Sequence, residues 1–265
     1  MPSNFSEELQ PMRYRSNFLT HVIVRADFDP VAELGGHVRP TLSQRIGDLF
    51  PVVETKPTSE VRLVVGPGGP QMTNETVGAV FEHRRGDAPL PLVALARDNL
   101  SIEYGAAYAD FGQLRGELAQ ILNWLAELHG AATSIKRLGM RYINEIVFPT
   151  GHALDWDGLI NPSLIDSVKA GVLENMRIKR STRSFEVLND DFAMHIHYGL
   201  FNPDYPSPLV RRHFVLDIDA YSERRMAVPE ALSCFDALNS ACDESFESSI
   251  ARGLRDHMGA VNDQV

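Results

Sequence analysis

The residues best suited to chemistry are histidines and aspartates on two predicted strands of the C-terminal half. His195 and His197 alternate with apolar residues in the segment FAMHIHYGL, and Asp217 and Asp219 do the same in RHFVLDIDAY. Because successive side chains of a strand point to opposite faces, each pair lies on the polar face of its strand. If the two strands are neighbours, all four side chains share one face of a sheet.

Three interpretations of this face are open. His195 and His197 could bind Zn²⁺ or Fe²⁺ together with Asp217, because an H-x-H strand supplies two imidazoles and a carboxylate completes the set. The same alternation is typical of any sheet face exposed to solvent. The third interpretation is a face that binds a ligand or a partner.

Basic residues are concentrated in the same half of an otherwise acidic sequence. Arg141 lies on a predicted strand, with an alternation that would place it on the face of His195. Such a face could bind an acidic peptide, a nucleotide or a nucleic-acid backbone. Alternatively, the basic side chains form ordinary surface ion pairs with nearby aspartates. The residues that we predict for a ligand- or partner-binding site are Arg141, His195, His197, Arg211, His213, Asp217 and Asp219.

The sequence lacks the motifs of common enzymes. The glycine- and proline-rich segment 66–70 has no Lys-Ser/Thr pair, and its prolines remove N–H donors, so we expect a turn rather than a phosphate-binding loop. No G-x-S-x-G, H-E-x-x-H or C-x-x-C motif occurs. We therefore predict no catalytic residue and no cofactor, and we expect a non-catalytic binding or accessory protein.

The composition excludes further classes of function. The chain has 265 residues, a formal net charge of −10 and a sequence pI near 5.4. This acidity argues against binding to nucleic acid without sequence preference and to anionic membranes. Cys234 and Cys242 lie too far apart on one predicted helix to bridge each other. With no apolar leader or membrane segment in view, we expect a reduced, cytoplasmic protein.

Apolar periodicity predicts an α+β protein whose two halves repeat one order of elements. Each half has a strand, a helix, a set of antiparallel strands and a long terminal helix. The first long helix follows Asp110, which forms a capping box with Gln113, and the second runs from near Pro229 towards Met258. The strand LSIEYG before one long helix parallels LDIDAY before the other, from which we infer an internal duplication.

The predicted halves are residues 1–131 and 132–265, packed as one compact unit. Each half resembles the helix-grip arrangement of the TATA-binding-protein-like and START-like folds, in which a curved antiparallel sheet wraps a long helix. This likeness implies a fold and no particular ligand. It allows another function, a small-molecule carrier with a cavity between sheet and helix. Open edge strands would also favour a homo-oligomer.

Several segments together resemble an uncharacterised, sporadically distributed bacterial family of similar length. They are FLTHVIVRADF at the first strand, LFPVVE, RLGMRYINEIVFP, FVLDIDAY, and ALNSACDESFESSI in the last helix. These markers are structural and include no catalytic signature. The resemblance implies an accessory protein from a mobile or defence-associated locus, whose partner is a protein or a small molecule.

Overall fold

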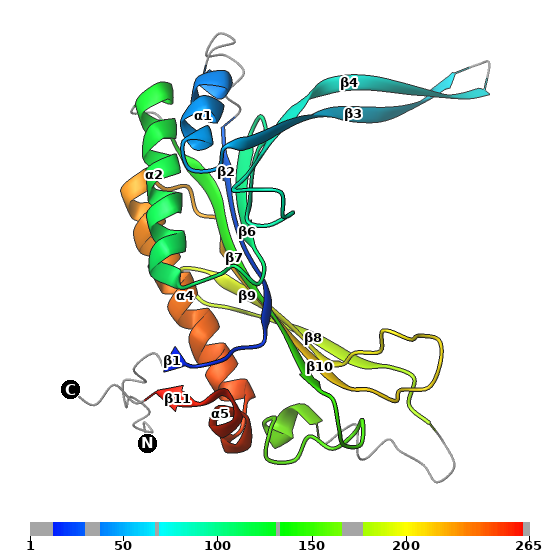
Figure 1. The fold of residues 1–265 in the computed structure, drawn as a ribbon. Helices are drawn as coiled ribbons and strands as arrows, with labels where there is room; N and C mark the ends of the chain where they lie inside the picture. The colour runs from blue at the N-terminus through cyan, green and yellow to red at the C-terminus, as the bar shows by residue number, and fades with distance from the viewer. Residues whose placement is uncertain (1–12, 30–37, 67–68, 131–132, 166–176, 262–265) are drawn as a thin grey trace. The chain divides into compact units, whose positions relative to one another are not determined.

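The computed structural model describes residues 13–29, 38–66, 69–130, 133–165 and 177–261. Its helices are α1 (Val38–Gly47), α2 (Phe111–His129), α4 (Val228–Ser249) and α5 (Arg252–Met258), and residues 162–165 are also helical (Figure 1). Its strands are β1 (Arg13–Tyr14), β2 (Leu19–Phe28), β3 (Val52–Gly66), β4 (Gly69–Arg84), β5 (Leu92–Leu95), β6 (Asn99–Tyr104), β7 (Ile135–Phe148), β8 (Ser181–Leu188), β9 (Ala193–Leu200), β10 (Arg212–Ser222) and β11 (Ala260–Val261).

One antiparallel sheet contains nine of these strands, in the order β3-β4-β5-β6-β2-β7-β10-β9-β8, while β1 and β11 form a separate pair. The α+β class is confirmed. The predicted helix-grip fold, with two similar halves that each have their own sheet and long C-terminal helix, is wrong, because β2 pairs with β7. Pairing these two strands leaves no unpaired edge in the middle of the sheet. The structure does not support the duplication inferred from the order of elements.

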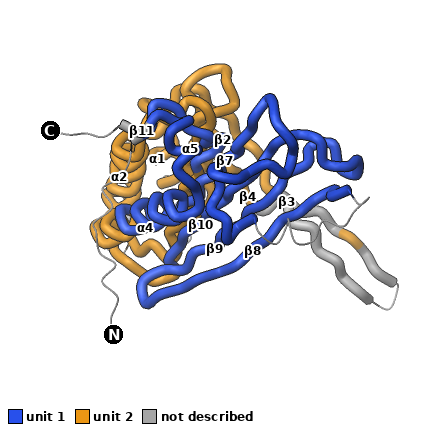
Figure 2. Tube along the Cα trace, turned by 90° about the horizontal axis from the view of Figure 1, so that it is seen from below, with its two compact units in different colours: residues 1–22, 140–222, 236–265 blue, residues 23–139, 223–235 orange. Residues whose placement is uncertain are grey.

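The chain divides into two compact units, each assembled from separate segments (Figure 2). Unit 1 contains residues 1–22, 140–222 and 236–265, and unit 2 contains residues 23–139 and 223–235. Strands β2 and β7 each continue from one unit into the other. The predicted boundary between residues 131 and 132 lies outside the described residues.

In unit 2, the sequence signal at the start of α2 is confirmed. The side chain of Asp110 accepts a hydrogen bond from the backbone N–H of Gln113 at 2.9 Å, which satisfies a donor at the helix N-terminus. The helix ends at Gly130, whose φ of 88° favours glycine. The buried stripe of α2 is Leu114, Leu118, Ile121, Leu122 and Leu125.

The glycine- and proline-rich segment 66–70 lies at the tip of the long β3–β4 hairpin in unit 2. Gly66 at the end of β3 pairs with Gly69 at the start of β4, and residues 67–68 lie outside the described residues. The flanking residues of the segment are thus paired as antiparallel strands, whereas the expected turn itself lies outside the described residues.

In unit 1, the part of helix α4 from residue 236 onward covers one face of the strands. The hydroxyl of Tyr142 on β7 donates a hydrogen bond to Oδ1 of Asn239 on α4 at 2.7 Å. Buried side chains alternate along the strands of this face. They are Met140, Tyr142 and Ile146 of β7, Leu216, Ile218 and Ala220 of β10, and Met194, Ile196 and Tyr198 of β9. The opposite face carries the polar alternate residues, and we call it the polar face. Its polar residues include Arg141 and Glu145 of β7, His213, Asp217 and Asp219 of β10, His195 and His197 of β9, and Ser184 and Glu186 of β8.

The last helix is interrupted, although we predicted one continuous helix towards Met258. Helix α4 ends at Ser249, Ile250 forms an isolated β-bridge with Ile160, and α5 begins at Arg252. Apolar residues keep a helical spacing through the break, so periodicity alone could not reveal it. Cys234 and Cys242 both lie on α4, and neither forms a disulfide among the described residues. None of the described helices is both long and apolar enough to cross a membrane.

Candidate functional site

The polar face of unit 1 brings four of the predicted binding residues together. In the antiparallel pairing of β10 with β9, Asp217 lies opposite His197, and Asp219 lies opposite His195. Residues that lie opposite each other in such a pair have their side chains on the same face. The two histidines and two aspartates are therefore neighbours.

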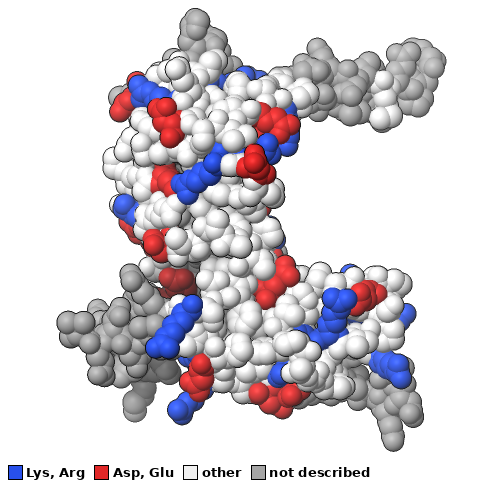
Figure 3. All heavy atoms as spheres, viewed as in Figure 1, with Lys and Arg blue, Asp and Glu red and all other residues white. Residues whose placement is uncertain are grey.

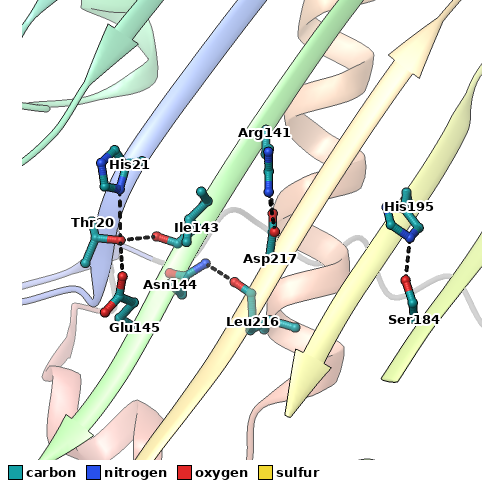
Figure 4. A network of polar contacts seen from close by, with 10 residues as sticks. All are labelled: Thr20, His21, Arg141, Ile143, Asn144, Glu145, Ser184, His195, Leu216 and Asp217. Carbon is teal, nitrogen blue, oxygen red and sulfur yellow. Dashed lines mark hydrogen bonds and ion pairs between the residues drawn. The ribbon is translucent and has the colours of Figure 1, made fainter. Parts of the chain in front are cut away.

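Arg141 of β7 joins the polar face through a bidentate contact with Asp217 (Figure 4). Its Nε donates to Oδ1 of Asp217 at 2.7 Å, and its Nη2 donates to Oδ2 at 2.6 Å. The Asp217 side chain is 12% exposed and that of Arg141 is 43% exposed. The hydrogen bonds to Asp217, with the charges of Asp217 and Asp219, raise the pKa of Arg141. The guanidinium is therefore a fixed positive charge that is already paired.

His195 contacts a residue of the neighbouring strand β8. Its Nε2 forms a hydrogen bond with the hydroxyl of Ser184 (Figure 4). The hydroxyl of Tyr221 donates to Glu186, which lies opposite His195 in the β8–β9 pairing. A hydroxyl beside an imidazole resembles an activated serine, but Ser184 and His195 are both exposed to water, whereas catalytic dipoles act most strongly where water is excluded. The contact is better explained as a cross-strand hydrogen bond.

His213 lies on the same side of β10 as Asp217 but is covered. It is 7% exposed, and its ring packs edge-on to Phe201 with centroids 4.8 Å apart. Its Nε2 lies 3.3 Å from the carboxylate of Glu145, which also accepts a hydrogen bond from Thr20 at 3.4 Å. Burial lowers the pKa of His213, although the charge of Glu145 acts in the opposite direction. His213 is therefore a buried packing residue of the sheet and not part of an exposed binding surface.

Arg211 does not reach the polar face. It precedes β10, and its Nε lies 3.0 Å from Oδ2 of Asp204, in a pair whose side chains are both at least half exposed. The next residue, Arg212, stacks its guanidinium over the rings of Phe148 at 4.8 Å and Trp156 at 5.3 Å. These arginines are engaged with loops, so the basic surface predicted for an anionic ligand does not form around them.

The polar face offers no metal cluster. Across the described ranges, no three His, Cys, Asp or Glu side chains are arranged to hold a metal ion. His195 contacts Ser184, and Asp217 binds Arg141, so two of the three proposed ligands already have other partners. The metal interpretation of His195, His197 and Asp217 therefore has no support from the geometry.

Negative charge predominates on the polar face. Its described residues include the carboxylates of Glu145, Glu186, Asp217 and Asp219, whereas Arg141 is paired with Asp217 alone of these. The two histidines add ring nitrogens that can donate or accept hydrogen bonds. A face with this excess of acceptors complements a cationic ligand.

Sequence reasoning missed the part of the site that β8 contributes. Ser184 and Glu186 lie in the segment STRSFEVL, all of which is exposed except its first residue. Because β8 is an edge strand with both faces open, its sequence shows no clear alternation of apolar and polar residues. Ser184 and Glu186 lie beside His195 because of the register between β8 and β9, and no local sequence pattern indicates that register.

Comparison with models of protein families, with curated proteins and with solved structures finds no match. The resemblance to a bacterial family therefore stays a prediction. Function is inferred below from the geometry of unit 1.

Proposed function

We propose that this protein is a non-catalytic binding or accessory protein, and that the polar face of unit 1 binds a basic segment of a partner protein. The excess of carboxylates on that face carries the proposal. Asp219 and Glu186 flank His195 on either side, one on β10 and one on β8. Lysine or arginine side chains of a partner would find carboxylates on β10 and β8, two strand spacings apart with His195 of β9 between them.

Contacts on the polar face favour binding over catalysis. Arg141 and Asp217 satisfy each other, and Ser184 and His195 form an exposed contact. A general base or nucleophile acts on a substrate that is held against it in a site closed to water. A rigid surface of paired side chains instead presents a fixed pattern of charge, as a recognition surface does.

The overall charge acts in the same direction. A formal net charge of −10 would draw a cationic partner towards the protein. The polar face would then determine where the partner binds. Attraction between exposed charges weakens as salt is added, so the complex should weaken as the ionic strength rises.

Fluorescence anisotropy of labelled peptides tests the proposal. We expect a lysine-rich peptide to bind, and glutamate-rich and neutral peptides of equal length not to bind. The variants Asp219→Lys and Glu186→Lys should each weaken binding about tenfold. Glu244→Lys, on an exposed residue of α4, changes the net charge equally and serves as the matched control. Equal loss of affinity in all three variants would reduce the effect to net charge and contradict a site on the polar face.

A search for turnover tests the non-catalytic part of the proposal. We expect the pure protein to leave nucleotides, esters and peptides unchanged. Turnover that stops in His195→Ala or Asp217→Ala would replace the binding role with an enzymatic one. Ser184→Ala would then show whether the hydroxyl beside His195 is the nucleophile.

A further inference from the structure

Strand β8 is an open edge of unit 1. It ends the sheet order and pairs with β9 through eight consecutive residue pairs without a shift of register. Among the described residues, no segment pairs with its outer edge. Its sequence contains no proline, and its register contains no bulge, which are two of the devices that protect an edge from another chain. Within the described part of the chain, the outer N–H and C=O groups of β8 therefore have no strand partner.

Apolar side chains remain exposed along this edge. Phe185 is 42% exposed and Val187 is 48% exposed, and both lie opposite buried residues of β9, Ile196 and Met194. The ring of Phe185 packs edge-on to that of Tyr198, with centroids 6.0 Å apart. The apolar layer beneath α4 therefore continues to the edge and stays partly in water. A second apolar edge strand would bury it.

Charges are ordered by sign along the chain around Phe185. The positive residues Arg177, Lys179, Arg180 and Arg183 precede it, and the negative residues Glu186, Asp190 and Asp191 follow it. All of them are exposed. Within the described part of the chain, none of these basic side chains forms an ion pair, although Arg180 stacks over the ring of Tyr205 at 5.1 Å. Figure 3 shows both signs over the region that Figure 1 labels β8 and β10.

We infer that β8 docks against β8 of a second copy of this chain, antiparallel and about a two-fold axis at Phe185. The reversed direction places the positive end of each strand beside the negative end of the other. Within β8, residues at equal distances from Phe185 then face each other. Lys179 and Arg180, which directly precede β8, come beside Asp190 and Asp191 of the second copy, which lie in the turn between β8 and β9. This contact between opposite charges occurs twice in the dimer.

The register about Phe185 also suits the side chains between these charges. Because opposite residues share a face, Arg183 lies over Val187 of the second copy and can cover it with its aliphatic stem. A parallel pairing would instead place like charges side by side. A partner of a single sign fits less well, since an acidic segment would meet Asp190 and Asp191, and a nucleic acid would meet them too.

Mass measurements in solution test the dimer. Light scattering and native mass spectrometry of the full chain should give twice 29.5 kDa. Phe185→Lys places two like charges at the axis and should return the mass to 29.5 kDa. Val210→Lys makes the same change at a residue that is 75% exposed and outside β8, and it should leave the dimer intact. Both positions are exposed, so circular dichroism should show unchanged folding.

A charge exchange tests the register itself. Arg180→Glu and Asp190→Arg should each raise the dimer dissociation constant at least tenfold, because each brings like charges together. Mixing the two variants should restore a dimer, since one copy then offers acidic and the other basic residues at both positions. Combining both changes in one chain should also restore it.

Three results would overturn the inference. They are a wild-type monomer at every concentration tested, a dimer that survives Phe185→Lys, and a failure of the mixed variants to associate. Asp219 lies on β10 and not on the docking edge, so Asp219→Lys should leave the mass of the assembly unchanged. A failed dimer test would therefore leave the proposed binding function standing.

Discussion

The guanidinium of Arg141 on β7 and the carboxylate of Asp217 on β10 form a bidentate ion pair across two neighbouring strands. The pair is asymmetric in its exposure, since Asp217 is largely covered and Arg141 is not. Removing the arginine would leave a carboxylate with little water to solvate it. The contact thus fixes the central charge of the polar face.

Arg141→Ala should lower the free energy of unfolding by about 1–3 kcal/mol, because Asp217 loses two charge-assisted hydrogen bonds. Urea unfolding of Arg141→Ala, Asp217→Ala and the double variant gives the coupling energy, which should be on the order of 1 kcal/mol. Arg25→Ala is the control, since Arg25 forms a similar pair with Asp27 but is 51% exposed. Its cost should stay below about 1 kcal/mol, and an equal cost at both sites would contradict the special status of the Arg141 pair.

Stability should fall as the pH rises between 4 and 6, because of Asp243 on α4. Burial, with the nearby charges of Glu247 and Glu244, raises the pKa of Asp243 from 3.8 to about 6, against the effect of a hydrogen bond from Asn239. The folded state therefore holds this proton more tightly than the unfolded state. The contribution is fully present below pH 3.8 and is lost as the pH passes about 6.

Asp243→Asn should remove that loss. At pH 7.5 the variant should be more stable than the wild type by on the order of 1–3 kcal/mol. Well below pH 3.8, where the folded and unfolded wild-type chains both hold the proton, the difference should largely vanish. Chemical unfolding at the two pH values makes the comparison. A variant that is less stable than the wild type at pH 7.5 would show that the ionised carboxylate is accommodated in the fold.

Unit 2 contains a polar cluster around Glu117, which is 8% exposed. Tyr104 donates its hydroxyl to Oε2 at 2.5 Å, Gln113 donates to Oε1 at 2.9 Å, and Arg85 also binds the carboxylate. Burial and the hydrogen bond to Glu117 raise the pKa of Tyr104, so its phenol stays a donor. Glu117→Gln should lower the free energy of unfolding by about 1–3 kcal/mol, because Arg85 loses its counterion.

The matched control for this cluster is Glu127→Gln. The side chain of Glu127 is 60% exposed and pairs with Arg45 in the same unit, so its loss should cost less than about 1 kcal/mol. Thermal or urea unfolding would show the difference. Equal effects at both positions would mean that burial adds nothing to the Glu117 contacts.

The N-cap of α2 provides a local test. Asp110→Ala removes the acceptor for the N–H of Gln113 and should cost about 0.5–2 kcal/mol. Asp110→Ser keeps an acceptor at that position and should recover most of the loss. A full loss in both variants would mean that the carboxylate acts through its charge rather than as a cap.

Local features of the fold could be predicted from sequence. The Asp110 cap, the buried stripe of α2 and the alternation along β9 and β10 all reflect contacts within a few residues. The pairing of β2 with β7 was not predictable, because periodicity shows that a strand forms but not which strand lies beside it. The break between α4 and α5 was not predictable for a related reason, since both helices bury apolar residues at the same spacing.

The candidate site shows the same limit. Alternation placed His195, His197, Asp217 and Asp219 on polar strand faces, and the β9–β10 register brings them together. Alternation alone could not show that Asp217 pairs with Arg141 on this face while Phe201 packs over His213. Burial by a loop depends on tertiary packing. Arg211 was included because it lies near β10 in sequence, but its partner Asp204 lies in a loop.

The binding role of the polar face is tested most directly by NMR of the histidine rings during titration with a lysine-rich peptide. His195→Gln and His197→Gln assign the two signals. The peptide should shift the signals of His195 and His197 and leave that of His152, on the loop after β7, in place. Glu186→Lys should require about tenfold more peptide to produce the same shifts. Binding that leaves both polar-face histidines unchanged, or no binding at low salt, would contradict the proposed function.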